Sequence, residues 1–116
     1  MGIVHIEGTV SGPQGSETVR FIVDSGAKYS LLPMKVWQKI GLKPKHEMEF
    51  SLVDGSIIKR SISECHIELR VGAAHTPVIL GEAQDEALLG VITLEILGVV
   101  INPFTREIQP MRLTLA

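Results

Sequence analysis

The sequence is poor in cysteine, in clustered histidine and in long apolar runs. A single cysteine, Cys65, cannot form an internal disulfide, and the four histidines of this 116-residue chain are not spaced like zinc ligands. The longest apolar stretches, residues 87–91 and 96–101, fall well short of the roughly 20 residues that cross a bilayer. We therefore expect no bound metal and no membrane-spanning segment.

Neither sign of charge dominates. The chain has 11 Lys+Arg and 13 Asp+Glu, so it lacks the positive field that attracts a polyanion, and we expect no nucleic-acid partner. The N-terminus has no basic flank leading into an apolar stretch, which argues against a secretory signal and favours a cytoplasmic protein. A hydrophobic content of 45% at this length predicts one globular domain over residues 1–116.

The chain is built from short segments rich in Val, Ile and Leu, separated by Gly and Pro. This pattern predicts strands joined by turns, and therefore an all-β domain. A first hairpin is expected around a six-residue turn at 11–16, and a second around Asp54-Gly55, a dipeptide typical of tight turns. The expected strands are residues 3–10, 17–23, 47–52, 57–62, 65–71, 76–80 and 99–101, with a final extended segment at 106–115.

Two short helices are expected as well. Pro33 suits the first position of a helix, whose apolar stripe includes Trp37 and ends at Gly41. We interpret Trp37 as a core residue, because it lies on that stripe. A second helix is predicted over residues 91–97, with Gly98 as its C-terminal stop.

The tripeptide Asp24-Ser25-Gly26 is notable because it directly follows an apolar strand. A carboxylate at the end of a buried strand is costly unless it is hydrogen-bonded or functional. The same three residues are also good turn formers. On the tripeptide alone, a turn is the simpler interpretation.

The surrounding sequence changes that interpretation. The string from Phe21 to Ala27, followed by Ser30-Leu31-Leu32-Pro33, resembles the active-site segment of retropepsin-like aspartic proteases, the single-domain relatives of pepsin. Leu88-Leu89-Gly90 resembles the second landmark of that family, two apolar residues and a glycine that lead into a helix. Asp54-Gly55-Ser56 stands where such proteases carry the flap, a hairpin that folds over the substrate. The resemblance implies an all-β fold, a closed pepsin-like barrel with one or two short helices.

The resemblance also implies roles for the residues of the first motif. Asp24 would be the catalytic aspartate, and Ser25 would hold the two active-site loops of a dimer together through its hydroxyl. Gly26 would let the backbone approach the carboxylates closely, and Ala27 would be the next residue of the same active-site loop. The chemistry needs two carboxylates that share one proton, and only one Asp-Ser-Gly occurs, so the second must come from another copy of the chain. Asp54 is the rival within the chain, but it is better explained as a turn residue.

The function implied is therefore that of a homodimeric aspartic endopeptidase. It would cut peptide or protein substrates in extended conformation with two Asp24 carboxylates, and it would need no cofactor. The chief alternative is a non-catalytic peptide-binding module of the same fold, which binds an extended peptide by strand addition. A third is a structural β-domain whose tail residues Met111, Leu113 and Leu115 form an interface.

Two further candidate sites are weaker. Cys65 and His66 are neighbours on a predicted strand, so their side chains point to opposite faces and cannot form a nucleophile–base pair. His66 and Glu68 share a strand face, but two ligands do not make a metal site.

Overall fold

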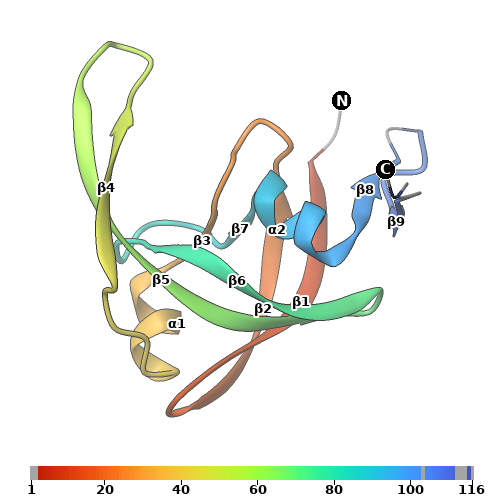
Figure 1. The fold of residues 1–116 in the computed structure, drawn as a ribbon, viewed down its shortest axis with the longest axis horizontal. Helices are drawn as coiled ribbons and strands as arrows, with labels where there is room; N and C mark the ends of the chain where they lie inside the picture. Colours follow the sequence, from red (N-terminus) through yellow and green to blue (C-terminus); the bar gives the residue numbers. More distant parts are fainter. Residues whose placement is uncertain (1–2, 103, 112–114, 116) are drawn as a thin grey trace.

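The computed structural model describes residues 3–102, 104–111 and 115 (Figure 1). It is built mainly of strands, with two short helices. The elements in chain order are β1 (Val4–Gly12), β2 (Gly15–Val23), β3 (Ser30–Leu32), α1 (Met34–Lys39), β4 (His46–Ser51), β5 (Ile57–Leu69), β6 (Gly72–Leu80), β7 (Leu88–Leu89), α2 (Val91–Leu97), β8 (Val99–Ile101) and β9 (Ile108–Pro110).

Seven of these strands form one sheet, in the order β1-β2-β7-β3-β6-β5-β4. A further antiparallel pairing of β1 with β5 closes six of them into a barrel and leaves β4 outside it, paired with β5. β8 and β9 form a separate two-stranded sheet. The expected fold, an all-β closed barrel with two short helices, is confirmed.

Strand alternation explains the core. Phe21 on β2 is fully buried, and Cys65 and Ile67 on β5 face the same interior. Burial raises the pKa of the Cys65 thiol to about 12, and the neighbouring charge of Glu64 adds to that shift. His66 lies between the two buried residues and is half-exposed, so the expectation that Cys65 and His66 point to opposite faces is confirmed.

The first hairpin is tighter than the sequence suggests. The predicted six-residue turn at 11–16 is wrong, because β1 and β2 stay paired to Gly12 and Gly15 and leave only Pro13 and Gln14 in the turn. Gly15 has φ 138°, a conformation that favours glycine. The N–H of Gln14 donates to the carbonyl of Ile40 (2.9 Å), so the end of α1 holds the tip of this hairpin.

The second correction concerns β5. Residues 57–62 and 65–71 were expected to be two strands, but residues 57–69 form one continuous strand of 13 residues, and Val71 lies in the turn that follows. Ile62 and Ser63 are consecutive and both buried, where β5 passes from its pairing with β4 into the barrel. That local break in alternation made one long strand look like two.

Both expected helices are present, but α1 begins one residue later than predicted: Pro33 is in extended conformation (ψ 156°) as the N-cap, and Met34 is the first helical residue. α2 has the predicted bounds, and Gly98 ends it in the left-handed conformation at φ 69°. Trp37 on α1 is half-buried against the core, and its indole N–H donates to the carbonyl of Gly81 (2.8 Å), which supports its interpretation as a core residue. No helix in the described part of the chain is long and apolar enough to span a membrane.

The final extended segment, expected at 106–115, is shorter in the structure. Of its described residues only Ile108–Pro110 form a strand, and Arg106 adopts φ 60° in the turn before it. The N–H of Met111 donates to the carbonyl of Gly98 (2.6 Å), which ties this residue to its own chain. Of the three apolar tail residues, Leu115 is exposed and Leu113 lies outside the described residues.

Candidate active site

Asp24 follows the last residue of β2 and is exposed, although β2 itself is buried up to Val23. Its carboxylate accepts a hydrogen bond from the N–H of Gly26 (2.8 Å), and its carbonyl accepts one from Ala27 (3.2 Å). A Cβ at Gly26 would lie 3.2 Å from the same carboxylate oxygen, which is tighter than an ordinary contact. The small residue therefore suits the close approach of its backbone to the carboxylate.

The second motif lies directly beside the first. β2 and β7 run parallel, with Val23 opposite Leu89, and the N–H of Asp24 donates to the carbonyl of Leu89 (3.1 Å). The first two N–H groups of α2 are satisfied by the loop after Asp24: Val91 donates to the carbonyl of Ala27 (2.8 Å) and Ile92 to that of Lys28 (2.9 Å). Residues 24–30 and 88–93 thus form one hydrogen-bonded unit, which we call the Asp24 platform.

Gly90 is required where these two segments meet. A Cβ there would lie 2.5 Å from the carbonyl carbon of Tyr29 and 2.6 Å from the carbonyl oxygen of Lys28, both of which are backbone atoms. Backbone cannot move aside as the end of a side chain can, so no larger residue fits without displacing the loop after Asp24.

A cluster of buried hydroxyls joins the two segments of the platform to each other and to β6. The hydroxyl of Ser30 accepts a hydrogen bond from the N–H of Gly90 (3.0 Å) and lies 2.5 Å from the hydroxyl of Thr93, which is 2.8 Å from that of Thr76. All three side chains are at most 2% exposed. Buried hydroxyls that are fully hydrogen-bonded fix the relative position of the elements that carry them, here β3, β6 and α2.

This hydroxyl cluster was missed in the sequence. Ser30 was noticed only as part of the first motif, and Thr76 and Thr93 were assigned no role. The available signal was a threonine at a core-facing position: Thr76 alternates with Val78 and Leu80 on β6. The sequence carried no sign that the three residues converge.

The candidate flap residues form the tip of the β4–β5 hairpin, which extends away from the barrel (Figure 1). The hydroxyl and N–H of Ser56 both donate to one carboxylate oxygen of Asp54 (2.6 and 2.9 Å), and Gly55 has φ 88°. The Ser56 hydroxyl, with help from the Ser56 N–H, holds the pKa of Asp54 below its ordinary value of 3.8. Asp54 thus organises its own turn, as a turn residue does.

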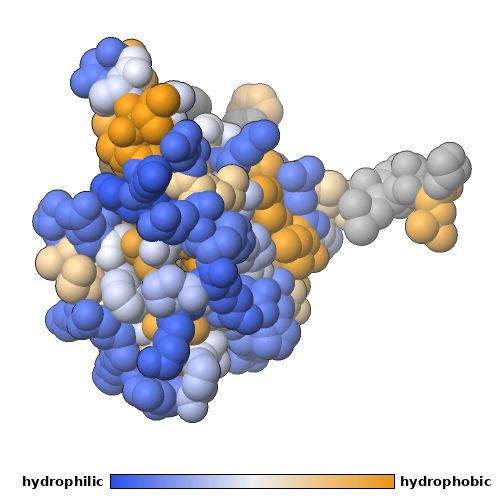
Figure 2. Space-filling model, turned by 60° about the vertical axis from the view of Figure 1, so that its left-hand side comes forward, coloured by the Kyte–Doolittle hydropathy of each residue, from blue (hydrophilic) through white to orange (hydrophobic). Residues whose placement is uncertain are grey.

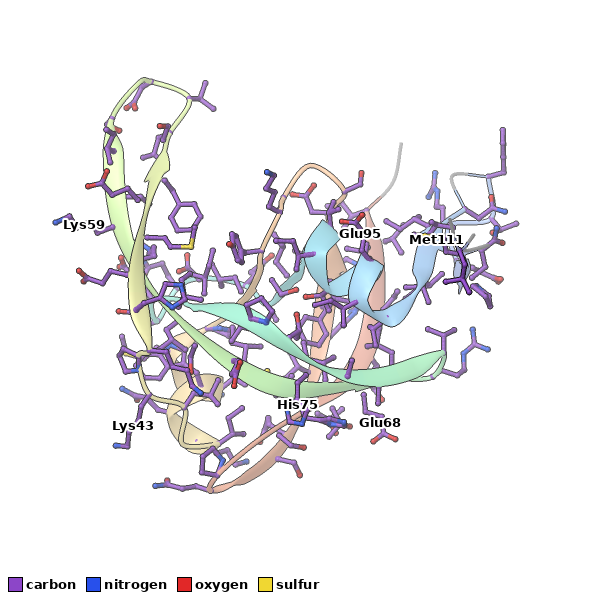
Figure 3. All side chains as sticks on the ribbon, viewed as in Figure 1. Lys43, Lys59, Glu68, His75, Glu95 and Met111 are labelled. Carbon is purple, nitrogen blue, oxygen red and sulfur yellow. The ribbon has the colours of Figure 1, made fainter. Side chains whose placement is uncertain are left out.

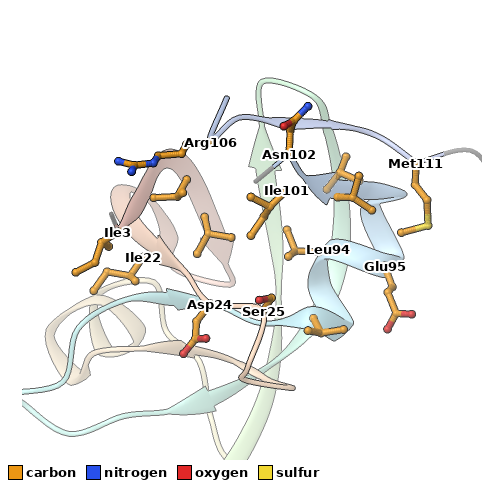
Figure 4. Close-up of a pocket in the computed structure, with 15 residues that line it drawn as sticks. Ile3, Ile22, Asp24, Ser25, Leu94, Glu95, Ile101, Asn102, Arg106 and Met111 are labelled. Carbon is orange, nitrogen blue, oxygen red and sulfur yellow. The ribbon is translucent and has the colours of Figure 1, made fainter. Parts of the chain in front are cut away.

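A pocket opens beside Asp24 and Ser25 (Figure 4). Its walls are mostly apolar and come from both ends of the chain and from α2, including Ile3, Leu94 and Ile101. Glu95 is a second carboxylate on this pocket that sequence reasoning did not consider. Its carboxylate lies well apart from that of Asp24 in Figure 4, so the two do not form a pair.

The structure therefore brings the first motif (Asp24, Ser25, Gly26 and Ala27) against the second (Leu88, Leu89 and Gly90). It places Asp54, Gly55 and Ser56 at a separate hairpin tip that rises on the same side as the Asp24 loop (Figure 1). Among the described residues, no three His, Cys, Asp or Glu side chains gather closely enough to hold a metal ion.

Comparisons with known proteins agree with this architecture. The model of the family described as "gag-polyprotein putative aspartyl protease" matches residues 7–95. A search of curated proteins finds no match by sequence.

Several solved structures share the fold at low sequence identity. The EIAV protease, in complex with an inhibitor, superposes with a TM-score of 0.64 at 14% identity, covering 98% of this chain and 94% of its own. The retroviral protease-like domain of Ddi1 from Leishmania major gives 0.64 at 14% identity, with 95% and 89% coverage. The simian foamy virus protease gives 0.59 at 16% identity, with 80% and 93% coverage.

Proposed function

The chain belongs to the retropepsin-like aspartyl proteases, and from that premise we propose that it is an endopeptidase whose catalytic residue is Asp24. The observation that carries this proposal is the placement of Asp24. It is an exposed carboxylate at the end of a buried strand, oriented by the N–H of Gly26 and fixed by the neighbouring motif. A turn residue needs no such support from a second, distant segment of chain.

The proposed reaction needs two carboxylates with one proton between them. The ionised group takes a proton from water as the water oxygen attacks the peptide carbonyl carbon, and the protonated group gives its proton to the carbonyl oxygen. When the tetrahedral intermediate collapses and the C–N bond breaks, the carboxyl that took the proton from water gives it to the leaving nitrogen, and the other carboxylate takes a proton from a hydroxyl of the intermediate. Each carboxylate thus acts once as an acid and once as a base.

We assign the second carboxylate to Asp24 of another copy of the chain. The rivals within the chain are poorly suited, because Asp54 is bound to Ser56 at the hairpin tip and Glu95 lies apart from Asp24. A twofold axis between two Asp24 loops would give both carboxylates the same surroundings, and a single shared proton would break that symmetry. The apolar pocket wall beside Ser25 suits contact with a second copy.

The proposed substrate is a peptide or an unfolded protein segment in extended conformation. Such a segment would lie between the Asp24 platform and the β4–β5 hairpin, both of which offer backbone groups to a strand-like ligand. The same geometry would serve a module that binds a peptide without cutting it, so cleavage itself has to be measured.

The test is a cleavage assay on a denatured protein and on a peptide library. Asp24→Asn should abolish hydrolysis, with a loss of about 10³-fold or more, because an amide can neither accept nor donate the shared proton. The matched control is Asp85→Asn, which keeps the side-chain oxygen that accepts the N–H of Glu82 and should leave turnover unchanged. Asp24→Asn with wild-type turnover would refute the assignment, and wild-type protein that binds peptides but never cuts them would favour the binding module.

A further inference from the structure

The β4–β5 hairpin meets the Asp24 platform through a pair of aromatic rings. The ring of Tyr29, on the platform, and that of Phe50, on β4, are 6.1 Å apart between centroids and cross at 87°, edge to face. In the described part of the chain, no hydrogen bond joins residues 46–58 to residues 24–30. An edge-to-face contact adds only a little to the burial of the rings, so it can open and re-form easily.

The side of the hairpin that carries Phe50 is apolar. Met48 and Phe50 are half-buried on one face of β4, whereas the intervening Glu49 is exposed on the other. Phe50 pairs with Ile58 across the hairpin, and the neighbouring Lys59 points away from the barrel (Figure 3). Phe50 and Ile58 thus form an apolar inner face that meets the platform at Tyr29.

Charge on this inner face is neutralised. Arg60 lies opposite Met48 on the hairpin, and its guanidinium is paired with Glu82 at 3.0 Å. A substrate side chain entering between Tyr29 and Phe50 would therefore meet mainly aromatic and aliphatic carbon, and the guanidinium of Arg60 already has a carboxylate partner.

We propose that Tyr29 and Phe50 determine the substrate specificity of this protein: the two rings part to admit a large apolar side chain of the peptide, aromatic or long aliphatic, and then pack against it. This inference rests on the proposed function, because it concerns the same peptide-binding site. Neither residue takes part in the proton transfers. Their role is to bind and position the peptide beside Asp24.

The energetics of exchange explain the selectivity. With a large apolar side chain, each ring loses one apolar partner and gains another, so the hairpin opens at little net cost. A small side chain would leave the separated rings without a partner, and a charged one would lose its hydration without a counter-charge. Discrimination therefore comes from the contact that the substrate must replace.

The first experiment compares cleavage of peptides that vary at one position. Wild type should prefer large apolar residues at one subsite, and Phe50→Ala should reduce that preference by roughly tenfold, mainly through KM. Phe50→Tyr keeps the ring and should restore the preference. The matched control is Ser51→Ala, an exposed neighbour on the opposite face of β4, which should behave as wild type. A Phe50→Ala enzyme with the wild-type preference would overturn the proposal.

A second readout does not depend on cleavage. Tyr29 is the only tyrosine in the chain, so fluorotyrosine labelling gives one ¹⁹F signal that reports on this ring. The chemical shift of this signal should differ between Phe50→Ala and wild type. In the Asp24→Asn variant, which should not cleave the added peptide, the chemical shift should change when a Leu- or Phe-containing peptide is added, but not when the matching Lys peptide is added. If wild type cuts nothing, the proposed function fails while this measurement still decides the specificity. An unresponsive signal, or an equal response to both peptides, would overturn the proposal.

Discussion

The Asp24 platform and the β4–β5 hairpin lie on the same side of the molecule but are held in very different ways. The two distant segments of the platform are joined by backbone hydrogen bonds and by the buried hydroxyls of Ser30 and Thr93, and Thr93 in turn is hydrogen-bonded to Thr76 on β6. In the hairpin, β4 lies at the edge of the sheet and pairs with β5, and large apolar side chains at and beside the tip are exposed: Leu52, Val53 and Ile57. Figure 2 shows apolar surface close to the tip of the hairpin.

This difference matches what peptide hydrolysis asks of the two regions. A proton-transfer group has to be held in place to within a fraction of an ångström, whereas a segment that covers the substrate has to move to let it in and out. Substitutions in the platform should therefore cost stability and activity together. Substitutions in the hairpin should leave the fold largely intact.

The largest effect is expected from Gly90→Ala compared with Gly55→Ala. At Gly90 the added methyl would collide with the backbone at Tyr29 and Lys28, so the loss should be about 3 kcal/mol or more. At Gly55 the added methyl would have no atom within 4 Å, so only the backbone strain of φ 88° would destabilise the variant, by about 1 kcal/mol. Chemical denaturation of both variants measures the difference, and equal losses would contradict the contrast between the regions.

A smaller effect is expected from the hydroxyl cluster. Thr93→Val keeps the shape of the side chain but leaves the hydroxyls of Ser30 and Thr76 without their common partner, at a cost of about 2 kcal/mol. Turnover should fall as well, by roughly tenfold, because Ser30 also receives the N–H of Gly90 on the platform.

The matched variant for this cluster is Thr76→Val, which keeps the bonds from Ser30 to Thr93 and Gly90 and should cost about half as much. If both valine variants are as stable and active as wild type, the cluster does not support the Asp24 loop.

The smallest effect is expected at the hairpin tip. The pKa of Asp54 lies below 3.8, because its carboxylate is stabilised by Ser56. The stabilisation of the turn is therefore present above that ordinary value and is lost as the pH falls through the lowered pKa. Ser56→Ala removes the hydroxyl bond but keeps the N–H bond, so NMR titration should show the pKa of Asp54 rising toward 3.8 without reaching it. An unchanged pKa would mean that the hydroxyl is not the main cause.

The sequence predicted the fold well where local signals agree with the final structure. Gly98 marks the end of α2, and Asp54-Gly55 marks a hairpin turn, because both depend on the conformation of a few adjacent residues. The predictions were wrong where contacts between distant parts of the chain determine the length of a turn or a strand. The tight turn at Pro13 and Gln14 is held by Ile40, and the length of β5 is set by its two different partners, β4 and β6.

The same distinction holds for the candidate site. Asp24 and its motif could be recognised because the pattern is contiguous. The convergence of Ser30, Thr76 and Thr93 could not, since these residues are up to 63 positions apart and become neighbours only when α2 packs on β3 and β6. The same is true of Tyr29 and Phe50, which belong to different predicted segments.

The central claim is that Asp24 works only as a pair formed by two copies of the chain. Sedimentation and turnover measured across one dilution series test it most directly. We expect specific activity to fall in proportion to the fraction of dimer, because each copy supplies one of the two carboxylates. Full specific activity from a protein shown to be monomeric at the same concentration would contradict the shared pair and require a second carboxylate within one chain.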